Sequence, residues 1–479
     1  MRGDKMKSCL EYFKEICTIP HGSGNEKALS DYVCQYAKQL NLDYFQDEHF
    51  NVIIKKPATK GAVKTDAVIL QGHLDMVCEK LGTCEHNFET DPIPYYIEDG
   101  IMRTKGTTLG ADDGIAISYM LRLLEATDVI HPDLECVFTT GEEVGLCGAV
   151  GLDMNGLKGR HLINLDAGPE GCMLVGSAGG GGVLISCPIQ WQPVTGQLMR
   201  LQISGLQGGH SGSEIDKERA NSIVLAGRLL NNLVDNKDAN LVYLRGGNKD
   251  NAIPRECELV VAISDFDLDA YEEWAQDWLD IFKKEYGETE LTMVIDIDEA
   301  VGYEKMMSNK TTKQVLNWIR LCPTGVIKKN LHLDDLVETS LNLAVVNTKE
   351  VDLQFRVSVR SSILSQQEDL ISKLVLLANV LELNCEVSET YPAWEYSPHS
   401  FLQDICQSVY QKRTGKSLKV MAVHGGLECG IFKLKVPELD IVALGCDSGD
   451  IHTPEEWLDL ESFERVYDYL TDILKALAQ

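Results

Sequence analysis

The stretch Val68-Ile69-Leu70-Gln71-Gly72-His73-Leu74-Asp75 decides the fold of this chain. Its apolar start is aliphatic and too short for a helix, so we expect a buried β-strand. Side chains two positions apart on a strand point to the same side, which places His73 and Asp75 together at the carboxyl end of that strand. Open α/β sheets put their sites at that edge, where a histidine can bind a metal while a nearby carboxylate orients its ring. The pair alone is a weak motif, because most histidines are core or surface residues, so its weight depends on the rest of the chain.

The composition predicts an acidic globular protein with more than one domain. The chain has 479 residues, of which 44 are basic and 73 acidic, and its formal net charge is −29. This length predicts two or three domains. The acidity argues against binding to nucleic acid and against an anionic membrane surface, since both attract Lys and Arg. We attribute the charge to solubility.

Cysteine use and the absence of targeting segments favour the cytoplasm. The fifteen cysteines are odd in number, scattered, and form no Cys-x-x-Cys motif. We therefore expect buried free thiols in a reducing compartment rather than disulfides or a zinc-thiolate site. The N-terminus has no apolar signal core, and no stretch is long and apolar enough to span a bilayer.

Element order predicts a catalytic domain with an insertion. Strands and helices alternate over residues 1–182, which indicates an α/β domain whose mixed, largely parallel sheet lies between helices. The pattern changes over 183–390, where we expect an inserted α+β domain, and the similar order of elements in its two halves suggests that they are related. The α/β pattern returns over 391–479 and completes the first domain. The glycine run 176–182 lacks the Gly-Lys-Ser/Thr of a phosphate loop, so we interpret it as a hinge or crossing point.

Histidine and acidic side chains follow the predicted strands or lie in the loops that those strands feed. They are His73, Asp75, Asp112, Asp113, Glu142, Glu143, Asp166 and His452. Because parallel strands open on one crevice, we expect these side chains to converge, and such carboxylates repel one another unless a metal neutralises them. Two histidines with several carboxylates suit zinc, with manganese and cobalt as substitutes, better than calcium or copper. The negative charges of three carboxylate ligands and one hydroxide would balance two divalent ions.

Two adjacent glutamates are more than metal binding requires. One of Glu142 and Glu143 can bind metal while the other takes a proton from water. The alternative is an exposed loop pair, as most Glu-Glu pairs are. Against it, the pair directly ends a predicted strand, and flanking glycines allow the backbone to approach closely. His424 also ends a predicted strand, and its role stays open: it could face the cleft.

The order of these motifs resembles the dinuclear zinc aminopeptidase-like family of aminoacylases, carboxypeptidase G and dipeptidases. Three further stretches are similar to its aminoacyl-histidine dipeptidase branch: 205–212 (GLQGGHSG), 251–256 (NAIPRE) and 424–430 (HGGLECG). The resemblance spans nearly the whole chain. It implies a zinc-aminopeptidase-like catalytic domain with an inserted lid and dimerisation domain, and hence a homodimer.

The resemblance also implies roles for individual residues. His73 and Asp166 bind a first zinc, Glu143 and His452 bind a second, and Asp112 bridges the two. Asp75 orients His73, and Glu142 is the general base. The resemblance further implies a cis peptide bond between Asp112 and Asp113. Relatives often have asparagine at the position of Asp113, a departure that we do not expect to affect a ligand.

On the expected lid, the resemblance implies that His210 and Asn251 reach the site of a neighbouring subunit. Arg360 ends a lid strand and is either a contact for a substrate carboxylate or an ordinary surface residue. The implied activity is metal-dependent hydrolysis of dipeptides, including those of the Xaa-His type. Two alternatives stay open: the same chemistry on N-acyl amino acids or longer peptides, and a scaffold protein without catalysis. The complete set of expected ligands argues against the scaffold.

Overall fold

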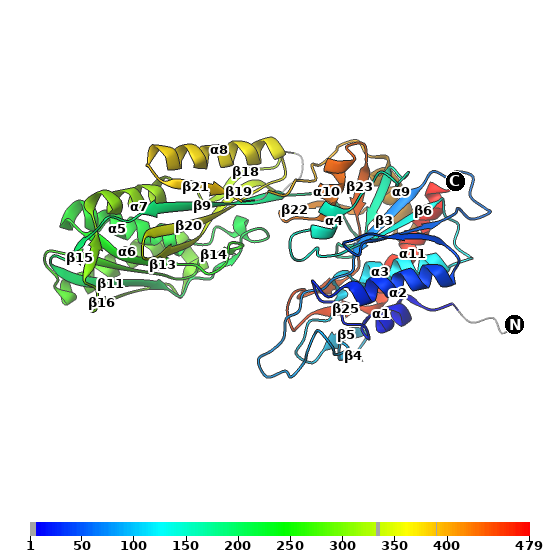
Figure 1. Ribbon diagram of the computed structural model, residues 1–479, viewed down its shortest axis with the longest axis horizontal. Coiled ribbons are helices and arrows are strands. Elements are labelled where there is room, and N and C mark those ends of the chain that lie inside the picture. The colour runs from blue at the N-terminus through cyan, green and yellow to red at the C-terminus, as the bar shows by residue number, and fades with distance from the viewer. Residues whose placement is uncertain (1–5, 332–335, 389) are drawn as a thin grey trace. The chain divides into compact units, whose positions relative to one another are not determined.

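The computed structural model describes residues 6–331, 336–388 and 390–479, and the chain forms two compact units (Figure 1). Unit 1 comprises the chain up to Ser177, Trp394–Ala422 and Leu427–Gln479, and unit 2 comprises Ala178–Ala393 and Val423–Gly426. The predicted domain boundaries, after residues 182 and 390, differ from these by a few residues. The prediction did not include the short return of the chain to unit 2 at Val423–Gly426.

Unit 1 contains an eight-stranded mixed sheet of order β1-β2-β6-β3-β7-β23-β8-β22. Its strands are β1 (Asp43–Gln46), β2 (Val52–Lys56), β3 (Val68–His73), β6 (Leu134–Thr139), β7 (His161–Asn164), β8 (Cys172–Ser177), β22 (Lys419–Val423) and β23 (Asp440–Ala443). A smaller sheet contains β4 (Tyr95–Glu98), β5 (Ile101–Thr104), β24 (Ser448–Gly449) and β25 (Trp457–Asp459). The helices are α1 (Cys9–Ile16), α2 (Lys27–Gln39), α3 (Ala111–Glu125), α4 (Cys147–Gly151), α9 (Phe401–Thr414), α10 (Glu428–Lys435) and α11 (Leu460–Leu477). The expected α/β class with a mixed sheet is confirmed.

Four adjacent strands at the centre of this sheet, β6, β3, β7 and β23, run parallel. His73 at the end of β3 pairs with Thr139 at the end of β6, so these strands finish at the same edge. All six residues of β3 are buried, as its apolar run predicts. A side chain at Gly72 would place its Cβ 2.3 Å from Cβ of Ala116, so glycine lets α3 approach the strand directly beside His73.

Unit 2 is built on a nine-stranded sheet of order β16-β11-β15-β13-β19-β20-β9-β21, with β18 paired to β19. Its strands are β9 (Gly179–Pro188), β11 (Gln197–Ser204), β13 (Asn240–Gly246), β15 (Cys257–Ile263), β16 (Val294–Glu299), β18 (Gly325–Lys329), β19 (Val337–Thr348), β20 (Asp352–Ser361) and β21 (Asn384–Val387). Two short pairs accompany it: β10 (Trp191–Pro193) with β17 (Lys305–Met307), and β12 (Gly209–His210) with β14 (Ala252–Ile253). The helices are α5 (Ser222–Lys237), α6 (Leu268–Tyr286), α7 (Asn309–Leu321) and α8 (Leu364–Val380), with 3₁₀ turns η1 (Ile215–Lys217) and η2 (Gly287–Glu290). Apolar residues of helices and sheet share one core.

The glycine run 176–182 lies where the chain crosses between the units, which confirms the predicted crossing point, and Gly179–Gly182 begin strand β9. β9 pairs with β20 from Gly179 to Pro188. A Cβ at Gly179 would lie 2.6 Å from the backbone nitrogen of Ala393, and one at Gly180 would lie 2.3 Å from the Tyr391 hydroxyl. The glycines therefore serve close packing of the returning segment against β9. The crossing itself lies between Ser177 and Ala178, within the run.

Two further expectations can be compared with the structure. All fifteen cysteines are free, and ten of them are buried, which confirms the expected free thiols. Among the described residues, no helix has the length and apolarity needed to cross a membrane.

Candidate metal centre

The carboxyl edge of the parallel strands in unit 1 brings the five predicted metal ligands together. His73 ends β3, Glu143 lies in the loop after β6, and Asp166 follows β7. Asp112 lies at the start of α3, where the chain is not yet helical, and its peptide bond to Asp113 is cis, as expected. His452 lies in the loop between β24 and β25. Residues far apart in the sequence thus meet because parallel strands end at one edge.

Asp112 lies between the two histidines. Its Oδ1 is 2.9 Å from Nε2 of His73, and its Oδ2 is 3.3 Å from Nε2 of His452. Nε2 of His73 is also 4.0 Å from Oδ2 of Asp166, and Nε2 of His452 is 2.8 Å from Oε1 of Glu143. Two atoms bound to one tetrahedral zinc at about 2.1 Å lie about 3.4 Å apart, and the four separations, from 2.8 to 4.0 Å, lie on both sides of this value.

Potential ligand atoms come within 4.8 Å of one another in three groups: His73 with Asp113 and Asp166, His73 with Glu142 and Glu143, and Asp112 with Glu143 and His452. Asp113 was expected to converge with these residues but was not assigned as a metal ligand. Its Oδ2 accepts a hydrogen bond from the backbone N–H of His73 at 3.2 Å, and its Oδ1 accepts one from Ala116 at 3.2 Å. Because both oxygens already hold the backbone, we interpret Asp113 as a support for His73. This position, where relatives often have asparagine, therefore contacts the predicted ligand His73, contrary to expectation.

Carboxylates crowd this edge, and their pKa values reflect it. Burial, followed by the charge of Asp112, raises the pKa of Asp166 well above its usual range. Burial also raises the pKa of Glu142, and the charge of Asp166 adds to the effect. Burial opposes ionisation of Asp112 too, but hydrogen bonds with His452 and His73 lower its pKa below the usual range. Hydrogen bonds with Asp112 and Glu143 raise the pKa of His452 to about 10. Divalent cations at this edge would relieve the repulsion, so the donor set fits a metal centre.

Asp75 connects the first histidine to the two glutamates. Nδ1 of His73 lies 2.9 Å from the main-chain oxygen of Asp75 and 3.5 Å from its carboxylate, so the main chain makes the closer contact with the ring. The Asp75 carboxylate accepts the backbone N–H groups of Glu142 at 3.0 Å and Glu143 at 3.3 Å, and the hydroxyl of Ser23 at 2.9 Å. Asp75 therefore fixes the loop of the two glutamates as well as the histidine. Nε2 of His73, on the other side of the ring, faces Asp112.

Glu456 supports the segment that carries Asp112, and the sequence did not reveal it. Its side chain is 2% exposed and accepts backbone N–H groups from four consecutive residues. These bonds come from Leu109 at 2.7 Å, Gly110 at 3.1 Å, Ala111 at 2.8 Å and Asp112 at 3.4 Å. Burial raises its pKa to about 7. The one available signal was its position four residues after His452.

A buried polar network lies beneath the ligands and was also missed. Nε2 of Gln71 donates to Oε2 of Glu428 at 2.5 Å, and the Thr139 hydroxyl donates to the same oxygen at 2.7 Å. Asn164 donates to Gln71 at 2.7 Å and accepts the backbone N–H of Asp166 at 3.2 Å. The sequence signal was a polar residue inside each apolar strand, which a parallel sheet buried on both faces rarely tolerates without a partner.

The three predicted lid residues, His210, Asn251 and Arg360, lie in unit 2, and so does His424, which was not predicted to belong to the lid. Strand β12 pairs with β14, and the N–H of Ser211 donates to the Asn251 carbonyl at 2.8 Å, so His210 and Asn251 lie on adjoining segments. Nε2 of His424 lies 2.7 Å from the Ser340 hydroxyl, and Ser340 pairs with Arg360 across β19 and β20. Burial, followed by the charge of Arg360, lowers the pKa of His424 to about 3.

Two of these side chains have defined orientations. Nδ1 of His210 accepts the backbone N–H groups of Gly212 at 3.2 Å and Ser213 at 3.1 Å, so the neutral ring carries its proton on Nε2. Arg360 is not an ordinary surface residue. Its Nη1 donates to the Tyr391 hydroxyl at 3.1 Å, and its Nε is buried without a hydrogen-bond partner among the described residues.

The chain is similar in sequence and fold to several known proteins. The cytosol non-specific dipeptidase of Escherichia coli strain K12 is 33% identical over 469 residues, which cover 98% of this chain and 97% of that protein. A crystal structure of aminoacylhistidine dipeptidase from Vibrio alginolyticus has a TM-score of 0.89 at 33% identity and covers 98% of this chain and 96% of that one. Aminopeptidase PepT from Bacillus cereus, with a TM-score of 0.57 and 16% identity over 99% of each chain, shares the fold alone. A model of the peptidase family M20/M25/M40 matches residues 69–476, and the chain belongs to this family.

Proposed function

We propose that this chain is a metal-dependent dipeptidase that hydrolyses dipeptides, including those of the Xaa-His type. The observation that carries the proposal is Asp112, whose two carboxylate oxygens each face a different histidine. Such a carboxylate can bridge two ions. The two relatives of 33% identity, one described as a non-specific dipeptidase and one as an aminoacylhistidine dipeptidase, support the substrate class.

We assign the two metal positions from the imidazole contacts. His73, Asp112 and Asp166 would hold the first ion, and Asp112, Glu143 and His452 would hold the second. Nitrogen and carboxylate ligands suit zinc, and manganese or cobalt are substitutes. When bound, two divalent ions polarise the peptide carbonyl and make a water molecule acidic near neutral pH.

Glu142 serves as the general base in this proposal. It lies beside Glu143, and its backbone N–H is fixed by Asp75 at 3.0 Å. Its carboxylate takes a proton from the attacking water and delivers it to the leaving amine. The burial that raises the pKa of Glu142 suits a group that must hold a proton for part of the cycle.

The residues of unit 2 bind the substrate and stabilise the oxyanion. The half-buried guanidinium of Arg360 would pair with the terminal carboxylate of a dipeptide, with His424 and Asn251 as further contacts. The Nε2–H group of His210 would donate a hydrogen bond to the oxyanion, and we propose that it does so at the site of a partner subunit in a homodimer. We propose a cytoplasmic location, as for the cytosolic relative.

A substrate panel tests the proposed function. Zinc-loaded protein is incubated with dipeptides, N-acetyl amino acids and tripeptides, and the release of free amine is followed. We expect the dipeptides to be cleaved fastest and a chelator to abolish the reaction. Faster cleavage of N-acetyl amino acids or tripeptides would contradict the dipeptidase assignment. No hydrolysis by verified metal-loaded protein would favour the scaffold alternative.

A further inference from the structure

The loop that carries Glu142 continues directly into α4, so the position of this short helix bears on the base. The backbone N–H of Leu146 donates to the Glu142 carbonyl at 2.9 Å, and that of Cys147 donates to Gly141 at 3.0 Å. The helix has the sequence Cys-Gly-Ala-Val-Gly, in which two of five residues are glycine. Glycine is a poor helix former, and so short a helix is not stable by itself. Its position must depend on contacts with other elements.

Lys435 supplies such a contact from the last turn of α10. Its ammonium group donates to the carbonyl oxygens of Ala149 at 2.7 Å, Val150 at 2.7 Å and Leu152 at 2.6 Å. These carbonyls belong to the end of α4, where a helix leaves its last acceptors unsatisfied. All three donors of the ammonium group are therefore used, and a cation at this end is also favoured by the helix dipole.

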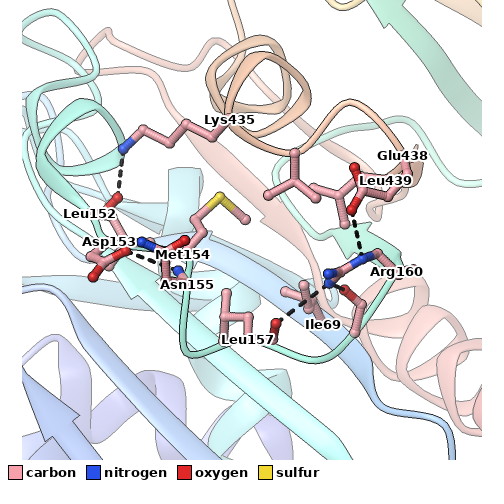
Figure 2. Close-up of a pocket in the computed structure, with 12 residues that line it drawn as sticks. Ile69, Leu152, Asp153, Met154, Asn155, Leu157, Arg160, Lys435, Glu438 and Leu439 are labelled. Carbon is pink, nitrogen blue, oxygen red and sulfur yellow. Dashed lines mark hydrogen bonds and ion pairs between the residues drawn. The ribbon is translucent and has the colours of Figure 1, made fainter.

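The contact lies at the wall of a cavity of about 430 Å³ in unit 1. Figure 2 shows the Lys435 side chain extending from α10 to the Leu152 carbonyl on one side of this cavity. On the opposite side, Arg160 pairs with Glu438 at 3.1 Å. The Arg160–Glu438 ion pair therefore lies across the cavity from the contact that Lys435 makes with α4.

The other end of α10 is fixed beneath the metal centre. Glu428, the first residue of the helix, accepts hydrogen bonds from Gln71 of β3 and Thr139 of β6. These strands lead to His73 and to the Glu142 loop, respectively. Helix α10 is thus attached to the strands through Glu428 and to the helix after the base through Lys435.

We propose that Lys435 is a positioning residue for Glu142, and that α10 works as a clamp that sets the distance between the base and the metal ligands. The inference rests on the proposed role of Glu142 as general base. Loss of the three hydrogen bonds would loosen the end of α4 and the loop before it, although Gly148 keeps its bonds to Asn51 and Thr140. That loop carries the ligand Glu143 as well as Glu142, while the other four ligands lie on other segments. Catalysis should therefore suffer more than metal or substrate binding.

The test compares Lys435→Met with Lys433→Met, a matched control on the same helix. Lys433 also donates to a carbonyl, that of Leu439 at 2.6 Å, which is not part of α4. At saturating zinc, we expect Lys435→Met to keep the metal content and KM of the wild type and to lose about tenfold to a hundredfold in kcat, the effect of a displaced catalytic group. Lys433→Met should keep the wild-type kcat. Hydrogen exchange of the Leu146 and Cys147 amides should be faster in Lys435→Met only.

A wild-type kcat in Lys435→Met, even with a lowered melting temperature, would overturn the proposal, because Lys435 would then act on stability alone. An equal loss of kcat in Lys433→Met would overturn it as well. If Lys435→Met does not fold, Lys435→Gln takes its place with the same expected and contrary results. Glu142→Gln is measured alongside: if it retains activity, the assignment of the base is wrong, whereas an inactive Glu142→Gln with an active Lys435→Met refutes the clamp alone.

Discussion

Replacement of Glu456 by glutamine should loosen the segment that presents Asp112. The Glu456 carboxylate accepts N–H groups from Leu109 and Gly110 on one oxygen and from Ala111 and Asp112 on the other. Glutamine has nearly the same shape but only one acceptor oxygen. Its amide nitrogen would face two backbone donors, whichever way the group is turned.

The geometry sets the size of the effect. Two buried N–H groups lose their acceptor, at about 1–3 kcal/mol each, so we expect a loss of about 2–6 kcal/mol in the free energy of unfolding. For a unit of this size that corresponds to a melting temperature lower by at least about 5 °C. Since one donor is Asp112 itself, metal affinity should also fall, by about tenfold to a hundredfold, as for other supports of metal ligands.

Calorimetry and zinc titration at pH 8, above the pKa of about 7 for Glu456, measure both effects. Glu455→Gln is the control, since it makes the same change at the neighbouring, exposed residue. A Glu456→Gln variant with the melting temperature and zinc affinity of the control would refute the reasoning, because the four hydrogen bonds would then contribute nothing to the free energy of unfolding or to metal binding.

Three further predictions concern the metals, the dimer and pH. Elemental analysis should find two divalent ions per chain after zinc loading, and chelation should abolish hydrolysis. Protein that retains no metal after incubation with zinc would contradict this. When inactive Glu142→Gln and His210→Ala homodimers are combined and exchange subunits, half of the dimers should contain one chain of each variant. Each such heterodimer has one complete site, so about a quarter of all sites should regain activity. Verified exchange without regained activity would exclude action of His210 in the partner's site. The folded state lowers the pKa of His424 to about 3, so between about pH 6.5 and 3 only the unfolded chain binds a proton at this residue. The free energy of unfolding should therefore fall as the pH falls, by up to about 1.4 kcal/mol per pH unit. In denaturant unfolding from pH 7 to 5, His424→Gln should lack this part of the slope, and equal slopes for both proteins would contradict it.

The sequence predicted the convergence of the ligands because it depends on a simple rule. Each of His73, Glu143 and Asp166 follows a strand of apolar residues, and parallel strands end at one edge. The family followed from the spacing and order of the same motifs, and it is confirmed.

The supports of the site could not be predicted, since their partners are backbone groups or distant residues. Glu456 binds N–H groups 344 to 347 positions away, and no pattern of side chains encodes that pairing. Gln71 and Glu428 meet across 357 positions inside the sheet. The packing of the segment of Tyr391 against the glycines of β9 could not be predicted either, because no pattern in the sequence encodes that contact.

The rate of dipeptide hydrolysis by Glu142→Gln, compared with the wild type at equal metal content, tests the proposed chemistry most directly. Glutamine keeps the size of the side chain and removes its ability to take a proton. We predict that the variant binds two ions, as the wild type does, and loses at least about a hundredfold in kcat, the usual contribution of a general base. A folded, fully metal-loaded variant that hydrolyses dipeptides at nearly the wild-type rate would contradict the assignment of Glu142 as the base.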